Sequence, residues 1–204
     1  MSASDAGQHV VADAVFPVVG RDLPRDHAQE LQQALIARLP WLSTDTVTGI
    51  HSLKLVHGNG TTGLLSRRSR LLLRVSAQRR DELNPLVGID LNVAGHSLRV
   101  GEAHVRELLP HATLYAYKVF AQSPDEVEFM ATVATELAKL GIKGEQVCGK
   151  RQQMNVSGKA FNVFSLMLHQ LLPAHSLRLQ QQGLGAHRQL GCGIFVPHKS
   201  AAAV

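Results

Sequence analysis

Two Gly-x-Gly elements near the end of the chain are the residues with the clearest chemical use. They are Gly183-Leu184-Gly185 and Gly191-Cys192-Gly193, and the five residues between them include His187 and Arg188. Paired glycines let a backbone approach a ligand closely and supply positive φ angles, and basic residues beside them favour an anionic ligand. The pattern therefore predicts a loop that contacts a phosphate-bearing molecule.

The known nucleotide-binding loops do not fit this stretch. The dinucleotide fingerprint places a strand before its glycines and a helix after them, in the spacing Gly-x-Gly-x-x-Gly. Here an expected helix, 173–182, precedes the glycines and an expected strand, 190–196, follows them, and no Gly-Lys-Ser or Gly-Lys-Thr is present. A small-molecule enzyme that holds a mononucleotide in this loop stays open as an alternative, and it would bind RNA with little dependence on salt.

Basic residues are concentrated in two fields that contain no acidic residue. The net charge is +5, and the two fields cover 46–80 and 146–204, with the members Lys54, Arg67, Arg68, Arg70, Arg74, Arg79 and Arg80 in the first and Lys150, Arg151, Lys159, Arg178, Arg188 and Lys199 in the second. Neutralising phosphates releases counterions and raises affinity, so this segregation favours a nucleic-acid backbone as the partner. The ordinary alternative is a solvated basic face without a partner.

Composition limits the cofactors and the location. Cys148 and Cys192 have no metal-ligand spacing, so we expect no metal and no other cofactor. The N-terminus lacks a basic region followed by an apolar run, and no segment approaches the roughly 20 apolar residues of a membrane helix. We therefore expect a cytoplasmic protein without a membrane partner.

The pattern of expected strands and helices that position these residues indicates one structural motif that occurs twice along the chain. The first round consists of a strand at 10–19, a helix opened by Asp22 with Pro24 just inside, strands at 50–56 and 69–76, a short helix at 79–86 and a hairpin at 89–100. Ala28, Leu31, Leu35 and Leu39 give the first helix its apolar stripe.

The second copy of the motif has clearer helix and strand signals in the sequence. It consists of a strand at 113–121, a helix from the capping box Ser123-Pro124-Asp125-Glu126 to Gly141, strands at 145–153 and 160–169, the helix 173–182 and a last strand at 190–196. We therefore predict an α+β fold of two tandem ferredoxin-like (βαββαβ) domains, 10–101 and 113–199, joined by 102–112 and ending in a Gly-rich loop. RNA-recognition modules use the same arrangement.

These features together resemble the CRISPR-associated endoribonucleases of the Cas-six family, whose signature is a C-terminal loop with paired glycines flanking basic residues. Further stretches are similar to the compact subgroup from myxobacterial-type systems: 16–20, 39–42, 49–51, 65–70 and 192–199. The resemblance covers residues 14–199, and its terminal motif is the most specific part.

The resemblance implies an enzyme that binds the repeat in precursor CRISPR RNA and cuts it without metal. The ribose 2′-hydroxyl would attack the adjacent phosphate, which leaves a 2′,3′-cyclic phosphate and a 5′-hydroxyl. The protein would hold the mature guide RNA and join other subunits of an interference complex. The alternative is a binding-only subunit that cradles guide RNA and cuts nothing.

Such chemistry needs a base for the 2′ proton, an acid for the leaving oxygen and positive charge near the phosphorus. The family commonly has a histidine in or near the first helix, and His27 matches this position. In a first helical turn the helix dipole disfavours imidazolium, as a base requires. His51, at the start of the expected strand 50–56, is the second catalytic candidate. An ordinary core-edge or strand histidine is the alternative in each case.

The RNA-binding candidates come from the two basic fields and the glycine loop. Guanidinium groups match phosphate oxygens and also stack on bases. The candidates are Arg67, Arg68, Arg70, Lys150, Arg151, Lys159, Gly183, Gly185, His187, Arg188, Gly191 and Gly193. For each charged side chain the alternative is an exposed charge without a partner.

Overall fold

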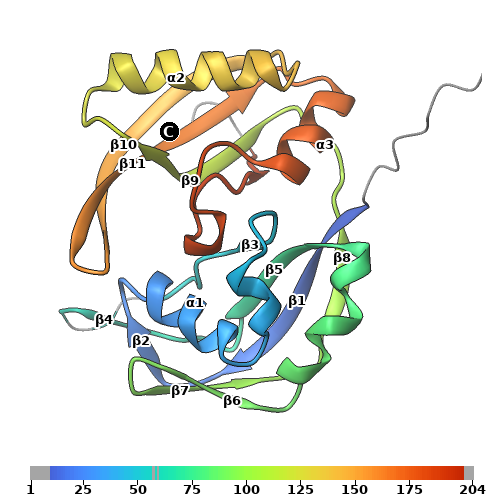
Figure 1. Ribbon diagram of the computed structural model, residues 1–204, viewed down its shortest axis with the longest axis vertical. Helices are drawn as coiled ribbons and strands as arrows, with labels where there is room; N and C mark the ends of the chain where they lie inside the picture. Colours follow the sequence, from blue (N-terminus) through green and yellow to red (C-terminus); the bar gives the residue numbers. More distant parts are fainter. Residues whose placement is uncertain (1–9, 57, 59, 200–204) are drawn as a thin grey trace, which may run out of the picture.

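The protein has an α+β fold, and its computed structural model describes residues 10–56, 58 and 60–199 (Figure 1). The N-terminal half is built on a sheet in the order β3-β5-β1-β7-β6, and β8 also pairs with β1. Its strands are β1 (Val11–Val19), β3 (Gly49–Ile50), β5 (Arg70–Ser76), β6 (Asp90–Val93), β7 (His96–Val100) and β8 (His104–Glu107). The helix α1 (Ala28–Ile36) and three short 3-10 helices, Pro40–Ser43, Ala77–Arg79 and Asp81–Leu86, accompany this sheet.

Alternation along β1 and β5 separates an apolar face from a polar one. Phe16 pairs with Leu71 and Ala14 with Leu73, and these side chains join the buried core under the α1 stripe. The next pair along the strands, Asp13 and Arg74, lies on the opposite face of the sheet. That face is turned toward the C-terminal half, because Arg74 bonds to carbonyl groups there.

The C-terminal half repeats the design with a smaller sheet in the order β10-β11-β9-β12. Its elements are β9 (Leu114–Ala121), α2 (Glu126–Lys139), β10 (Glu145–Val156), β11 (Lys159–His169), α3 (Pro173–Gln182) and β12 (Val196–Pro197). Phe129 of α2 stacks on Phe164 of β11 with ring centroids 4.5 Å apart, within a core that α2 and α3 share with the sheet.

The first helix begins later than predicted. Asp22–Pro24 forms a short strand, β2, that pairs with β4 (Thr62–Leu64), and α1 starts only at Ala28. The residue before a proline disfavours helical backbone, so Pro24 holds Leu23 extended. His27 is consequently the N-cap of α1 and not a residue of its first turn.

Two predicted strands are much shorter than expected. In the segment 50–56, the strand β3 ends at Ile50. The amide of Leu53 donates to the ring of His27 and therefore does not bond to a neighbouring strand. The last strand, predicted at 190–196, is reduced to Val196–Pro197, and the short 3-10 helix Arg188–Leu190 lies before it. Gly191 and Gly193 have φ angles of 81° and 64°, which interrupt an extended run.

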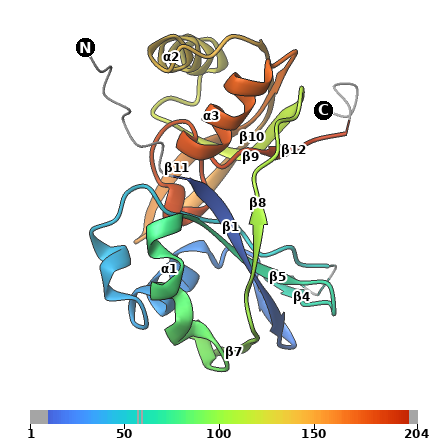
Figure 2. The ribbon, with the colours of Figure 1, turned by 90° about the vertical axis from the view of Figure 1, so that its right-hand side faces the viewer.

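Smaller differences concern the cap of α2 and the connection between the halves. Asp125 is the N-cap of α2 and accepts a bond from the amide of Glu128, so Pro124 precedes the helix. The connection 102–112 contains β8, which pairs with β1 and rises from the N-terminal half toward the C-terminal half (Figure 2). The hairpin predicted at 89–100 is confirmed, since β6 and β7 pair across a turn that includes Gly95. The sequence also predicts a turn at Gly58-Asn59-Gly60, between the expected strands 50–56 and 69–76, and Asn59 lies outside the described residues.

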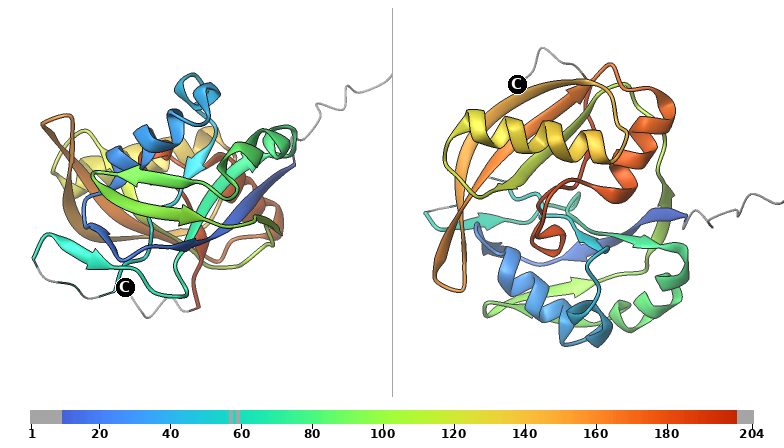
Figure 3. Two further views of the ribbon diagram at one scale, coloured as in Figure 1. Left: turned by 90° about the horizontal axis from the view of Figure 1, so that it is seen from below. Right: turned by 45° about the horizontal axis from the view of Figure 1, so that its top comes forward.

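The Gly-rich stretch lies between the two halves. In Figure 3 it descends from the C-terminal sheet toward α1 and the N-terminal sheet. A small apolar cluster joins the halves there: Ala28, Met154, Val163, Leu190 and Cys192. Within the described part of the chain, no helix is both long and apolar enough to cross a membrane.

Candidate active site

His27 is held between two backbone groups that fix its protonation. Its Nδ1 lies 2.8 Å from the carbonyl oxygen of Pro24, and its Nε2 accepts a bond of 3.2 Å from the amide of Leu53. A carbonyl oxygen only accepts and an amide only donates, so Nδ1 carries the proton and Nε2 carries the lone pair. The ring is therefore neutral in this arrangement.

The surroundings of His27 also favour the neutral ring. Burial lowers the pKa of the imidazole below its usual value, and the nearby charge of Lys118 lowers it further, although the bond to Pro24 acts in the opposite direction. Only 4% of the residue is exposed. A neutral imidazole at neutral pH is the form that can accept a proton.

His27 nevertheless borders open space. A hollow of about 140 Å³ lies between the two halves, and its lining residues are Arg25, His27, Ala28, Ser52, Leu53, Leu55 and Lys118. Lys118 comes from β9 of the C-terminal half, whereas the others come from the N-terminal half. The hollow thus combines a neutral histidine with two cationic side chains, which suits a group that carries negative charge.

His51 lies in a different environment. Its Nε2 is 3.6 Å from Oδ1 of Asp13, which is longer than an ordinary hydrogen bond. Burial lowers the pKa of His51, while the neighbouring Asp13 opposes the shift. His51 does not line the His27 hollow, so the structure does not bring the two catalytic candidates together.

Asp13 is the centre of the cluster that His51 joins. It bonds to Arg74 at 2.8 Å and 3.2 Å and to Arg106 at 2.7 Å. Burial raises the pKa of Asp13, but the nearby ring of His51 and the bonds from Arg74 outweigh this effect and hold the pKa well below its usual range. The cluster is an ionised, internally paired network.

Gly183 and Gly193, at the two ends of the loop, allow the loop to close on itself. A β-carbon on Gly183 would lie 2.5 Å from the carbonyl oxygen of Gly193, and one on Gly193 would collide with the carbonyl group of Leu184. Both positions also have positive φ angles. The close backbone approach at these two glycines joins the two ends of the loop to each other, and the predicted approach to a ligand stays a prediction.

The residues between the glycine pairs divide into an exposed tip and a buried base. Gly185, Ala186 and His187 are exposed, and the ring of His187 meets that of Phe120 edge-on at 4.7 Å. Arg188 is only 6% exposed, and burial, with a further effect from the charge of Arg74, lowers its pKa to about 10. Arg188 thus points inward in this structure, and its predicted RNA contact stays a prediction.

The remaining RNA-binding candidates lie mostly at the surface. Half-buried Arg70 donates to the carbonyl oxygens of Arg67 and Ser69, and the candidates with exposed side chains are Arg67, Arg68, Lys150, Arg151 and Lys159. Gly191 packs against the N-terminal half, where a β-carbon would lie 2.6 Å from Oγ of Ser52. The basic fields are less uniform than their sequence suggests, because Arg74 pairs with Asp13 and Arg79 with Glu82.

Sequence reasoning missed the three other polar residues of the hollow: Arg25, Ser52 and Lys118. The available signal for Lys118 was a cation within the otherwise apolar and aromatic run Leu114–Ala121. Its direction depends on an irregularity in the pairing of β9 with β11, where the register shifts between Phe164 and Leu166. Such an irregularity changes which side chains share a face, and alternation along the sequence does not reveal it.

Comparisons with known proteins agree with this architecture. A family model described as Cas6 CRISPR matches residues 12–200. The CRISPR-associated endonuclease Cas6 of Myxococcus xanthus is 37% identical over 196 residues, which are 96% of this chain and 85% of the relative.

Solved structures share the fold at low sequence identity. One described as CRISPR associated protein Cas6 superposes with a TM-score of 0.67 and 11% identity, covering 93% of this chain and 99% of the other. Cse3 of Thermus thermophilus, bound to an RNA representing a pre-cleavage complex, superposes with a TM-score of 0.54 and 12% identity, covering 92% and 98%.

The fold thus belongs to the class shared by Cas6 and Cse3 structures. The family match and the Myxococcus xanthus relative are more specific than the fold. The chain belongs to the Cas6 family of CRISPR-associated endonucleases.

Proposed function

We propose that this Cas6 protein binds the repeat of precursor CRISPR RNA and cuts it once through attack of a ribose 2′-hydroxyl, without a metal ion or other cofactor. The observation that carries the proposal is His27, a neutral imidazole that borders an interdomain hollow together with Arg25 and Lys118. The cut would release guide RNAs with 2′,3′-cyclic phosphate and 5′-hydroxyl ends, and the protein would act in the cytoplasm.

The proton path follows from the bonds of His27. The 2′-hydroxyl of the substrate takes the place of the Leu53 amide at Nε2, whose present bond is long at 3.2 Å. As the 2′ oxygen bonds to phosphorus, its proton passes to Nε2, and the bond from phosphorus to the 5′ oxygen breaks. The leaving 5′ oxygen takes a proton from a general acid and becomes the 5′-hydroxyl. The Pro24 carbonyl keeps the ring oriented and stabilises the imidazolium that forms.

Positive charge at the hollow stabilises the pentavalent phosphorane. Lys118 and Arg25 approach it from opposite halves of the protein. Donors fixed in advance around a developing negative charge act strongly where water is partly excluded. This interdomain placement makes the relative position of the two halves part of the catalytic geometry.

The rest of the RNA would lie along basic side chains at the protein surface, all of them exposed except the half-buried Arg70. In this proposal Arg67, Arg68 and Arg70 contact the backbone from the N-terminal half, and Lys150, Arg151 and Lys159 contact it from β10 and β11. The loop tip, with Gly185 and His187, faces the RNA, while Gly183, Arg188, Gly191 and Gly193 support the tip from below. Precursor and mature guide RNA, and further subunits of an interference complex, are the partners in this proposal.

We also propose that each half is a ferredoxin-like module, with the domains at 10–101 and 113–199. The C-terminal sheet places its second strand, β10, at one edge, followed by its third, first and fourth strands. The N-terminal sheet begins in the same way with β3-β5-β1, and the hairpin of β6 and β7 takes the fourth place, with β7 beside β1. This order, with a helix after the first strand, supports the assignment. The segment 173–193 then forms a helix and a Gly-rich loop that reach back to the first module.

The test uses repeat RNA with a chelator present throughout. We expect the wild-type protein to cut the RNA once, and to do so equally in the presence of EDTA. We expect no cut when the nucleotide on the 5′ side of the scissile phosphate is replaced by its 2′-deoxy form. The ends of RNA that co-purifies with the protein, read by sequencing, identify the scissile bond beforehand. Cleavage of the 2′-deoxy substrate at an unchanged rate would contradict the proposed attack.

A binding-only subunit is the second candidate, and one observation favours it. Both ring nitrogens of His27 already have backbone partners, as in a histidine that serves only to cap α1 and tie down Leu53. This candidate predicts repeat binding without cleavage in the wild-type protein. Because the family consists of endonucleases, we place catalysis first.

A further inference from the structure

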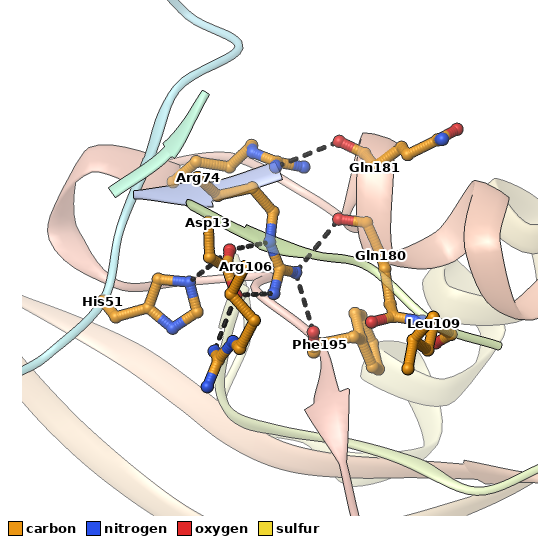
Figure 4. A network of polar contacts seen from close by, with 9 residues as sticks. Asp13, His51, Arg74, Arg106, Leu109, Gln180, Gln181 and Phe195 are labelled. Atoms are coloured by element: carbon orange, nitrogen blue, oxygen red, sulfur yellow. Dashed lines mark hydrogen bonds and ion pairs between the residues drawn. The ribbon is translucent and has the colours of Figure 1, made fainter. Parts of the chain in front are cut away.

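Arg74 forms a tie between the N-terminal sheet and both ends of the Gly-rich loop. Its Nε and Nη2 bond to the carboxylate of Asp13, while its Nη1 donates to the carbonyl oxygens of Gln180 at 3.0 Å and Phe195 at 2.8 Å. Gln180 precedes the first loop glycine and Phe195 follows the last one. Figure 4 shows the guanidinium between Asp13 on one side and these two carbonyl groups on the other.

The carbonyl groups at the end of α3 have a physical need for this cation. The last carbonyls of a helix have no partner within it and carry partial negative charge. The last turn of α3 contains no basic residue of its own. Arg74 supplies the donor for Gln180, and Arg188 donates to the next carbonyl, that of Gln181, at 3.1 Å.

The loop held in this way presses on the segment that contacts His27. Gly191 leaves no room for a β-carbon against Ser52, and Ser52 is followed by Leu53, whose amide bonds to Nε2 of His27. The middle of the loop is tied to the same half by Gln189, which donates to the carbonyl oxygens of Leu42 and Asp45. A shift of the loop therefore displaces the wall of the His27 hollow.

We propose that Arg74 is a positioning residue for the cleavage reaction, which sets the Gly-rich loop against Ser52 and Leu53 so that Nε2 of His27 keeps its orientation. Asp13 holds the guanidinium in place and balances its charge. The part of this proposal that concerns cleavage rests on the proposed function, whereas the tie between Arg74 and the loop does not.

Arg106 provides a matched control. It bonds to the same carboxylate of Asp13 at 2.7 Å but donates to neither Gln180 nor Phe195. Arg106→Ala removes one cation from Asp13 and leaves the loop contacts unchanged. Arg74→Lys keeps a charge for Asp13 but cannot reproduce the forked donation to the carboxylate and two carbonyl groups.

The first measurement is hydrogen exchange of the full-length protein without RNA. The informative amides are those of Leu184, Leu190 and Cys192, which bond within the loop. We expect their exchange to rise about tenfold or more in Arg74→Lys and to stay at the wild-type rate in Arg106→Ala. Arg74→Gln is a second variant, which removes the charge, and it should show the same rise in exchange. If Arg74→Gln does not fold, the exchange of Arg74→Lys alone tests the tie. Wild-type exchange of the loop in a folded Arg74 variant overturns the tie.

The second measurement is single-turnover cleavage of repeat RNA across pH. We expect Arg74→Lys to lower the rate constant at saturating RNA about tenfold or more, with the apparent RNA affinity within about threefold, and to shift the pH profile assigned to His27. A looser loop with an unchanged rate and profile overturns the positioning role. If the wild-type protein does not cleave, the proposed function fails, and the exchange result still decides the tie.

Discussion

His27 and His51 share the two properties that are often taken as marks of a catalytic histidine. In the N-terminal half His27 is buried and His51 is half-buried, and burial lowers the pKa of each imidazole. Their surroundings differ. His27 borders a hollow lined by Arg25 and Lys118, whose charges are not matched by a carboxylate in that lining, whereas His51 lies against Asp13, which Arg74 and Arg106 already bind.

This difference shows that burial and a shifted pKa describe two kinds of histidine. Structural ion-pair networks perturb titration as active sites do, so the shift alone is weak support for function. What separates His27 is the open space at the ring and a lining that contains two cations and no carboxylate. A substrate that brings its own negative charge fits the first site and has no place in the second.

The largest expected effect is the loss of cleavage in His27→Ala. Removing a general base typically lowers a rate by about 10²–10⁴-fold, and we expect this range for single-turnover cleavage of repeat RNA. Binding of an uncleavable 2′-deoxy repeat should change little, because phosphate contacts dominate affinity. A His27→Ala protein that cuts at the wild-type rate would remove His27 from the reaction while leaving the fold assignment intact.

The next effect concerns stability at the His51 cluster. Asp13→Asn leaves the buried guanidinium of Arg74 without its counter-charge, which should cost about 3–5 kcal/mol in the free energy of unfolding. Urea titration followed by circular dichroism measures it. The control is Asp90→Asn, which breaks the exposed pair with Arg99 and should cost about 0–1 kcal/mol.

The sign of the pH dependence adds a check on Asp13. Its folded pKa is depressed, so its contribution to stability is present above the unfolded value of about 3.9 and is lost as the pH falls toward the folded value. The stability difference between Asp13→Asn and the wild type should therefore shrink only below about pH 4. A constant difference down to pH 2 would show that the ion pair is not its source.

The contrast between the two histidines also shows what the sequence could predict. Alternating apolar residues in 11–19 and 70–76 fixed the strands of the N-terminal sheet, because one face of each strand must be buried. The segment 50–56 has a similar pattern, but most of it is not a strand, since the ring of His27 captures the Leu53 amide. That competition is a tertiary contact between residues 26 positions apart.

Charge along the chain was a poor guide to charge in space. Arg74 belongs to a stretch of 35 residues without a carboxylate, yet its cross-strand partner on β1 is Asp13. The glycine loop was predicted to approach an anionic ligand closely, and that remains a prediction. The close approach in the structure is between Gly183 and Gly193 of the loop itself. The position of His27 was predictable from the family resemblance, whereas the cation opposite it, Lys118, depends on an irregular strand pairing.

The pH profile of cleavage distinguishes the two histidines. Because the folded pKa of His27 is lowered, the ring stays neutral below the usual value of about 6.5, and the cleavage rate should begin to fall only at more acidic pH. Below that point the rate should fall about tenfold per pH unit, as expected for one essential base. Nitrogen chemical shifts of the His27 ring measure the same titration without RNA, and a ring protonated at pH 7 would rule out the proposed base.

A smaller effect is expected from the exposed basic residues. Arg67→Ala and Arg68→Ala should each weaken repeat binding and lower the slope of log affinity against log salt by about 1. Arg99→Ala, whose exposed side chain pairs with Asp90, is the control and should leave the slope unchanged. An unaltered slope in the double variant Arg67→Ala, Arg68→Ala would place the RNA elsewhere.

The smallest effect is expected for His51→Gln. Glutamine keeps a polar group near Asp13, and the carboxylate retains its bonds to Arg74 and Arg106. The cleavage rate should therefore stay within about threefold of the wild type, with the same pH profile, since His51 is not among the residues that line the hollow. A loss as large as that of His27→Ala would reverse the comparison, because it would mean that the site of chemistry lies at the ion-paired cluster and that the RNA must open it.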